Sequence, residues 1–70
     1  MTRDEHLEWA KERAMDYWLK GDLANAVTSM GSDLAKHPEL KPPEALIVLG
    51  LIHVIDHDAD GVKRWIEGWR

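Results

Sequence analysis

Apolar residues in the first half of the chain recur every three or four positions, which is the spacing of one helix face. The first set comprises Leu7, Ala10, Ala14 and Tyr17, and Trp18 and Leu19 widen it. The second set comprises Leu23, Ala26, Val27, Met30 and Leu34. Thr2 and Glu5 have the spacing of a capping box, and Gly21 suits the left-handed residue that ends a helix. These patterns predict two amphipathic helices joined by a short turn.

The second half begins after a proline-containing linker at residues 38–42. Pro43 suits the first turn of a third helix, where a missing N–H loses no hydrogen bond. The run from Ala45 to Ile55 is apolar on every side, so we expect a central buried helix. Its β-branched residues would also fit a buried strand, but that strand would have no partner. A fourth apolar set at helical spacing comprises Val62, Trp65, Ile66 and Trp69.

The two halves show a weak internal repeat. A shift of 36 positions, from Asp22 to Asp58, superimposes the turns and several apolar positions. The first half resembles a tetratricopeptide-type helix pair in its Gly21-Asp22 turn, its small Ala26 and its closing Pro38. The second half lacks the turn glycine and the final proline.

We therefore predict an all-α protein with one domain over residues 1–70. The fold class is a small four-helix domain of two antiparallel, tetratricopeptide-like α-hairpins. The first hairpin covers residues 3–37 and the second covers residues 43–70, on either side of the linker.

Composition narrows the classes of function. The chain has 70 residues, no cysteine and a formal charge of −4. Without cysteine it has no disulfide and no thiolate chemistry, and an acidic balance argues against direct binding of nucleic acid. The longest apolar stretch is about half of the roughly 20 residues that a membrane-spanning helix needs. No phosphate-binding loop or nucleophile motif is present, so we expect no enzyme activity, no cofactor and no membrane contact.

One acidic segment suggests a ligand. Residues 56–67 read Asp-His-Asp-Ala-Asp-Gly-Val-Lys-Arg-Trp-Ile-Glu, which has the D-x-D-x-D-G-x5-E spacing of a calcium-binding EF-hand loop. In that interpretation, the side chains of Asp56, Asp58, Asp60 and Glu67 would supply oxygens to one ion, and Gly61 would allow the sharp turn.

The same acids have a second interpretation as the start of a helix. Asp58 can act as an N-cap, and Asp60 is stabilised by the positive helix end. If the helix begins near Ala59, Glu67 lies about 12 Å along the axis and cannot close a loop. The repeat that matches Asp58 to Asp22 favours the cap. The two interpretations differ in whether the fourth helix begins before or after Gly61.

Two histidines offer a further candidate metal site. His53 and His57 are four residues apart with Asp56 beside them, and such a set can bind zinc or nickel. Pairs of histidines near carboxylates are common, and the alternative places His53 at the core interface and His57 in an exposed turn. A calcium- or metal-binding module is therefore an alternative function.

Tryptophan is abundant for a chain of this length, at Trp9, Trp18, Trp65 and Trp69. Four short helices cannot easily bury four indoles, and tryptophan is enriched at binding hot spots. We therefore predict that these residues form an interaction surface. This surface would also allow the chain to form a homodimer.

A longer pattern covers most of the chain: Thr2-Arg-Asp-Glu-His-Leu-Glu-Trp-Ala-Lys-Glu-Arg-Ala14, then Gly21-Asp22-Leu23, then Ser32-Asp33-Leu34 with Lys36-His37-Pro38-Glu39. It resembles short uncharacterised proteins of bacteriophages and prophages. The resemblance implies a small accessory protein in the cytoplasm of an infected bacterium and brings no known activity. Our hypothesis is that the protein binds a host or phage protein. One form of this hypothesis is an anti-CRISPR-like inhibitor of a host defence or regulatory complex; another is a self-associating structural phage component.

Overall fold

The computed structural model describes all 70 residues as four helices and no strand. The helices are α1 (Arg3–Leu19), α2 (Leu23–Ala35), α3 (Glu44–Ile55) and α4 (Ala59–Glu67). The predicted all-α, four-helix class is confirmed. The finer likeness to tetratricopeptide hairpins stays a prediction.

Local sequence signals start and end the helices as expected. Thr2 and Glu5 form the predicted capping box, in which the Glu5 N–H donates to the Thr2 hydroxyl at 3.1 Å and the Thr2 N–H donates to the Glu5 carboxylate at 3.0 Å. Gly21 has the left-handed φ of 78° that ends α1. Asp22 then caps α2, where its carboxylate accepts from the Asn25 N–H at 3.2 Å.

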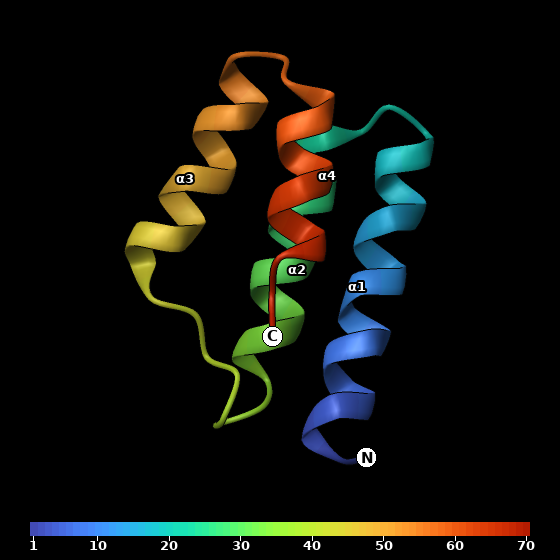
Figure 1. Ribbon diagram of the computed structural model, residues 1–70, viewed down its shortest axis with the longest axis vertical. Helices are drawn as coiled ribbons and strands as arrows, with labels where there is room; N and C mark the ends of the chain where they lie inside the picture. Colours follow the sequence, from blue (N-terminus) through green and yellow to red (C-terminus); the bar gives the residue numbers. More distant parts are fainter.

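The helices alternate in direction along the chain, and α1 and α3 lie on opposite sides of the molecule (Figure 1). Helices α2 and α4 occupy the middle, because both contact α1, α3 and each other. No contact joins α1 to α3. None of the four helices is long and apolar enough to span a bilayer.

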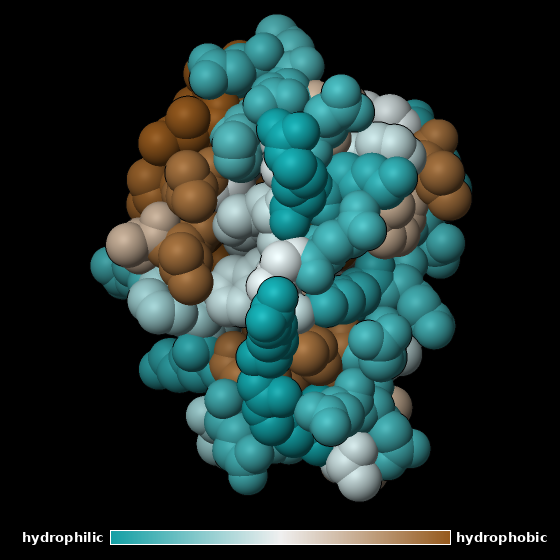
Figure 2. Space-filling view, in the orientation of Figure 1, coloured by the Kyte–Doolittle hydropathy of each residue, from teal (hydrophilic) through white to brown (hydrophobic).

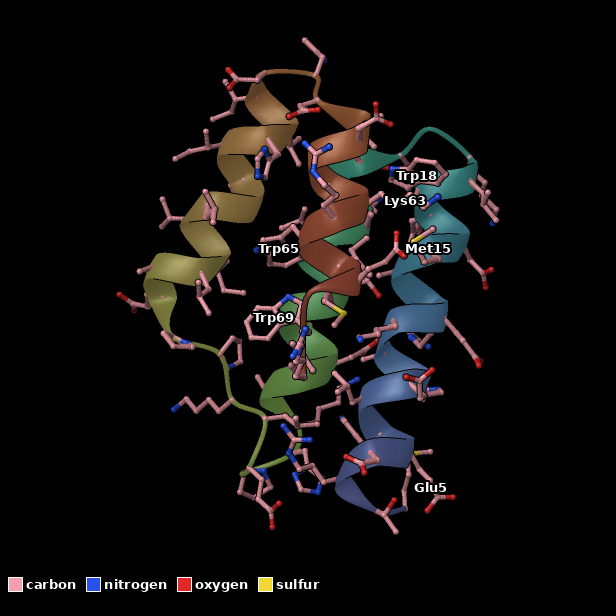
Figure 3. The ribbon with its side chains drawn as sticks, viewed as in Figure 1. Glu5, Met15, Trp18, Lys63, Trp65 and Trp69 are labelled. Atoms are coloured by element: carbon pink, nitrogen blue, oxygen red, sulfur yellow. The ribbon has the colours of Figure 1, made fainter.

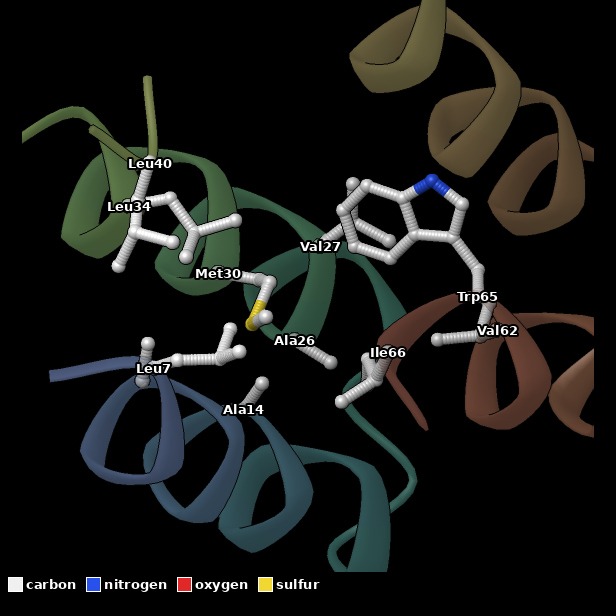
Figure 4. Packing of buried hydrophobic residues seen from close by; sticks show 11 residues of the cluster. Leu7, Ala14, Ala26, Val27, Met30, Leu34, Leu40, Val62, Trp65 and Ile66 are labelled. Atoms are coloured by element: carbon white, nitrogen blue, oxygen red, sulfur yellow. The ribbon is translucent and has the colours of Figure 1, made fainter. Parts of the chain in front are cut away.

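The core lies where α1, α2 and α4 meet (Figure 4). Its fully buried side chains come mostly from α2 and α4, and the largest are Met30, Leu34, Ile66, Val27 and Val62. Helix α1 contributes Leu7, Ala10 and Ala14. Leu19, the last residue of α1, was expected in the α1 row but is 72% exposed.

The prediction that α3 is a central buried helix is wrong. Of its residues only Gly50 is buried. Ile47 and Val54 pack against the core, while the other sides of α3 have no helix beside them. The physical reason is that four short helices provide α3 with only two neighbours, α2 and α4.

Two glycines set how closely α3 approaches its neighbours. A Cβ atom on Gly50 would lie 2.8 Å from Cε2 of Trp65 and 3.0 Å from Cγ1 of Val27. A Cβ atom on Gly31 would lie 2.9 Å from Cδ1 of Ile47. The glycine within α2, which the sequence marks only as a weak point in a helix, thus makes room for α3.

Candidate interaction surface

The start of α4 decides between the two interpretations of the acidic segment, because the helix begins before Gly61. The helix begins at Ala59 with Asp58 as its N-cap, and the Asp58 carboxylate accepts from the Gly61 N–H at 2.9 Å. The other oxygen of Asp58 lies 3.4 Å from Nδ1 of His53. Asp58 therefore caps α4 and contacts the end of α3 across the turn between them.

The candidate metal ligands are not gathered around one point. No group of three or more His, Cys, Asp or Glu side chains in the protein is arranged to hold a metal ion. Asp56, His57 and Asp60 are exposed around the turn. Glu67 is the last residue of α4, and its backbone carbonyl accepts from Nζ of Lys11 at 3.3 Å. The structure therefore brings together only His53 and Asp58 from the two predicted metal sets.

The four tryptophans have partners within the molecule. The Trp18 indole N–H donates to the Ala59 carbonyl at 2.7 Å, and the Trp65 indole N–H donates to the Leu46 carbonyl at 2.8 Å. Trp65 also meets Trp69 edge-on with ring centres 5.6 Å apart. Figure 3 shows Lys63 beside Trp18, with its ammonium 5.2 Å from the ring centre. Trp18 thus joins α1 to α4, and Trp65 joins α4 to α3, whereas the buried Trp69 indole N–H has no hydrogen-bond partner. The predicted contact of the tryptophans with a partner protein stays a prediction.

Trp9 belongs to a polar cluster that sequence reasoning missed. Asp33 is buried, and its carboxylate accepts from Nε of Arg13 at 2.8 Å and from Nζ of Lys36 at 3.2 Å. The same two cations lie over the Trp9 ring, 4.9 Å and 5.6 Å from its centre. Both cations remain about half exposed, so the cluster joins α1 to α2 without burying three charges. The Asp33–Lys36 spacing was the only signal of it in the sequence.

The largest unexplained feature is an apolar surface on α3, which we call the outer α3 face. Its members are large aliphatic side chains that remain between 40% and 74% exposed: Leu46, Val48, Leu49, Leu51, Ile52 and Ile55. In the space-filling view, apolar atoms gather over α3 (Figure 2). Apart from the chain terminus at Met1, the only other large hydrophobic residue with comparable exposure is Leu19, at the far end of α1.

Two grooves run along the sides of the outer α3 face. The first, of about 370 Å³, lies between α2 and α3 and is lined in part by Val27, Ala35, Ile47 and Leu51. The second, of about 410 Å³, lies between Leu46 and the end of α4, where Trp65 and Trp69 line it. Helix α3 thus forms an apolar ridge with an apolar groove on each side.

Comparisons with protein-family models, with curated proteins and with solved structures found no match to this chain. The function proposed below therefore rests on the chain's own surface and on the sequence pattern that resembles phage proteins.

Proposed function

We propose that this chain acts by binding another protein, without catalysis, and that the outer α3 face is its contact surface. The observation that carries the proposal is that six large aliphatic side chains on one helix remain 40% to 74% exposed. Contiguous exposed apolar patches are typical of binding surfaces, whereas single exposed apolar residues are ordinary. Leu19 is such a single residue.

The energetics support a contact of moderate strength. Fully burying a Val, Leu or Ile side chain contributes about 1.5–3 kcal/mol. Because roughly half of each of the six side chains is still in water, covering the face would contribute about 5–9 kcal/mol. Association costs about 4–15 kcal/mol. The face alone therefore nearly balances the cost, and a stable complex must also use the two grooves beside α3.

A second surface, on α1, supports the finer proposal about the partner's chemistry. Asp4, Glu8, Glu12 and Asp16 recur every four residues and are all exposed. Successive acidic residues of this row are about 6 Å apart along the axis of α1. Helix α1 makes no contact with α3. Acidic rows favour basic surfaces and speed the encounter with them.

Together with the resemblance to phage proteins, the acidic row supports an accessory protein that inhibits a host defence or regulatory complex with a basic surface. In this proposal the complex is a protein assembly, and the acidic row competes for the basic surface with that assembly's own anionic ligand.

The test is affinity capture from infected bacterial cells with matched variants of the tagged protein. We expect Ile52→Lys, in the centre of the outer α3 face, to lose the captured protein. Leu19→Lys adds the same charge at a 72% exposed leucine outside the face and should retain it. If both variants capture the same proteins as the wild type, the outer α3 face is not the binding surface.

A further inference from the structure

Three residues of the outer α3 face, together with the exposed Ala45, have the spacing of a coiled-coil seam. Ala45, Val48, Ile52 and Ile55 are separated by three, four and three residues, which is the alternation of a and d positions in a heptad. Gly50 faces the opposite way, against Trp65. We propose that this seam binds the same seam of a second copy of the chain, with the two α3 helices antiparallel. The inference rests on the proposed function and names the partner of the outer α3 face.

Side-chain sizes favour the antiparallel direction. With a two-fold axis near Gly50, Val48 lies opposite Ile52 of the second copy, and Ala45 lies opposite Ile55 of the second copy. Each small residue then meets a large one, and the seam keeps an even thickness. A parallel pair would instead place alanine against alanine at one end and isoleucine against isoleucine at the other.

Charge favours the same direction. The start of α3 carries Lys41 and Glu44, which offset each other, together with the partial positive charge of a helix N-terminus. The end of α3 is acidic, with Asp56 and Asp60 exposed and Asp58 half-buried. An antiparallel pair brings the acidic end of each copy beside a helix start that has no net formal charge and only the partial positive charge of the helix N-terminus. A parallel pair would place acid beside acid.

The surface available on α3 suits a weak dimer. A standard interface covers about 800 Å² on each partner, which is roughly a fifth of the 4504 Å² surface of this chain. One 12-residue helix of about 18 Å offers less than that. The paired seams are therefore smaller than a standard interface, and we expect a weak, concentration-dependent dimer.

Such a dimer leaves the acidic row on α1 free. Because α1 makes no contact with α3, pairing through α3 would place an acidic row on each outer side of the dimer. The basic partner suggested above would then meet two identical rows, and its binding would gain from both.

The first test measures the mass of the purified full chain by sedimentation and by light scattering from micromolar to submillimolar concentration. We expect a concentration-dependent dimer. Ile55→Lys, at a position 74% exposed in the single chain, should raise the dissociation constant by roughly tenfold or more. Leu19→Lys should leave it unchanged. Circular dichroism of each variant checks that the helices are retained.

The second test examines direction. Val48→Lys and Ile52→Asp should each be monomeric alone, since each puts charge into the seam. When mixed, the two variants should form a heterodimer, because the Val48→Lys position of one chain then lies opposite the Ile52→Asp position of the other. A parallel pair would not restore binding in this mixture.

Two results would overturn the inference. One is a wild-type chain that stays monomeric throughout the concentration range, and the other is a dimer that Val48→Lys, Ile52→Asp and Ile55→Lys all leave intact. Neither result decides the proposed function. If a monomeric wild type still captures a cellular protein that Ile52→Lys loses, the face binds a different protein; if no variant affects capture, the proposed function fails as well.

Discussion

Asp22 and Asp58 cap the second helix of each hairpin with nearly the same backbone angles, φ −92° and ψ 75° against φ −91° and ψ 83°. Each is preceded by a left-handed residue, Gly21 in the first turn and His57 in the second, with φ of 78° and 54°. The Asp22 N–H donates to the Tyr17 carbonyl at 3.0 Å, as the Asp58 N–H donates to the His53 carbonyl at 2.9 Å. Both turns therefore end a helix with the same Schellman-type bonds and begin the next with an aspartate.

The hairpins differ in what surrounds them. Helix α1 has three buried residues and α2 has five, whereas α3 has only Gly50. The same turn thus serves one hairpin with both helices packed into the core and another with its first helix at the edge. Turn geometry is a local property, and burial depends on how many neighbours the rest of the chain supplies.

The largest expected difference in the loss of unfolding free energy is between substitutions at core positions of α2 and at outer positions of α3. Met30 is fully buried, so Met30→Ala should lower the free energy of unfolding by about 2–5 kcal/mol. Ile52→Ala should change that of the dilute monomer by less than about 1 kcal/mol, because much of its side chain is already in water. Urea unfolding at low protein concentration measures both. Equal losses would mean that α3 is as buried as α2.

The next largest difference in stability is expected between alanine substitutions at Gly50 and Gly31, the two glycines against which neighbouring helices pack closely. Gly50→Ala places a methyl group against the Trp65 ring and should cost about 1–3 kcal/mol through overpacking. Gly31→Ala meets only the tip of Ile47, which can move, and the gain in helix propensity of about 1 kcal/mol offsets the strain. Thermal unfolding compares the two. A stabilised Gly50→Ala would show that α3 does not pack closely on α4.

The capping aspartates should behave alike. Asp22→Ala and Asp58→Ala should each cost about 1 kcal/mol, and Asp58→Asn should retain most of the stability because asparagine also caps helices. Thermal unfolding with and without added calcium tests the rival function. We expect the wild-type melting temperature to be unchanged by calcium. A rise that Asp58→Ala abolishes would support a calcium site instead.

The left-handed residues should respond in opposite directions. A non-glycine residue in this conformation costs about 1 kcal/mol or more, so His57→Gly should stabilise the protein by about 1 kcal/mol. Gly21→Ala should destabilise it by a similar amount, and for conformational reasons alone, since nothing lies within 4 Å of an added Cβ. Chemical unfolding of the two variants measures the difference. Changes of the same sign would mean that the two turns are not equivalent.

The smallest effect concerns the first cap. Hydrogen bonds from the Thr2 backbone N–H and from its side chain lower the pKa of Glu5 below its usual 4.5. A carboxylate with a lowered folded-state pKa stabilises the protein above its unfolded pKa, and this stability is lost as pH falls through the folded value. Glu5→Gln keeps the capping box without titrating. Acid unfolding curves should therefore show wild type losing stability relative to Glu5→Gln below about pH 4.5, and parallel curves would contradict this.

Sequence reasoning succeeded where a few neighbouring residues decide the structure. The capping box at Thr2, the end of α1 at Gly21 and the cap at Asp58 follow from hydrogen bonds between residues close in the chain. The second left-handed residue was missed because histidine does not signal it. The repeat did indicate the turn, through the match of Asp58 to Asp22.

Which helix faces are covered depends on packing between helices that are distant in the chain. The run in α3 is apolar all round, so its pattern does not indicate which side of the helix packs against the core. Much of α3 is exposed because α2 and α4 are its only neighbours. The buried charge of Asp33 is compensated by Arg13, which reaches it from another helix. Helix positions and turns were thus determined by the sequence through local hydrogen bonding. The apolar surface that supports the proposed function arises from packing between segments far apart in the chain.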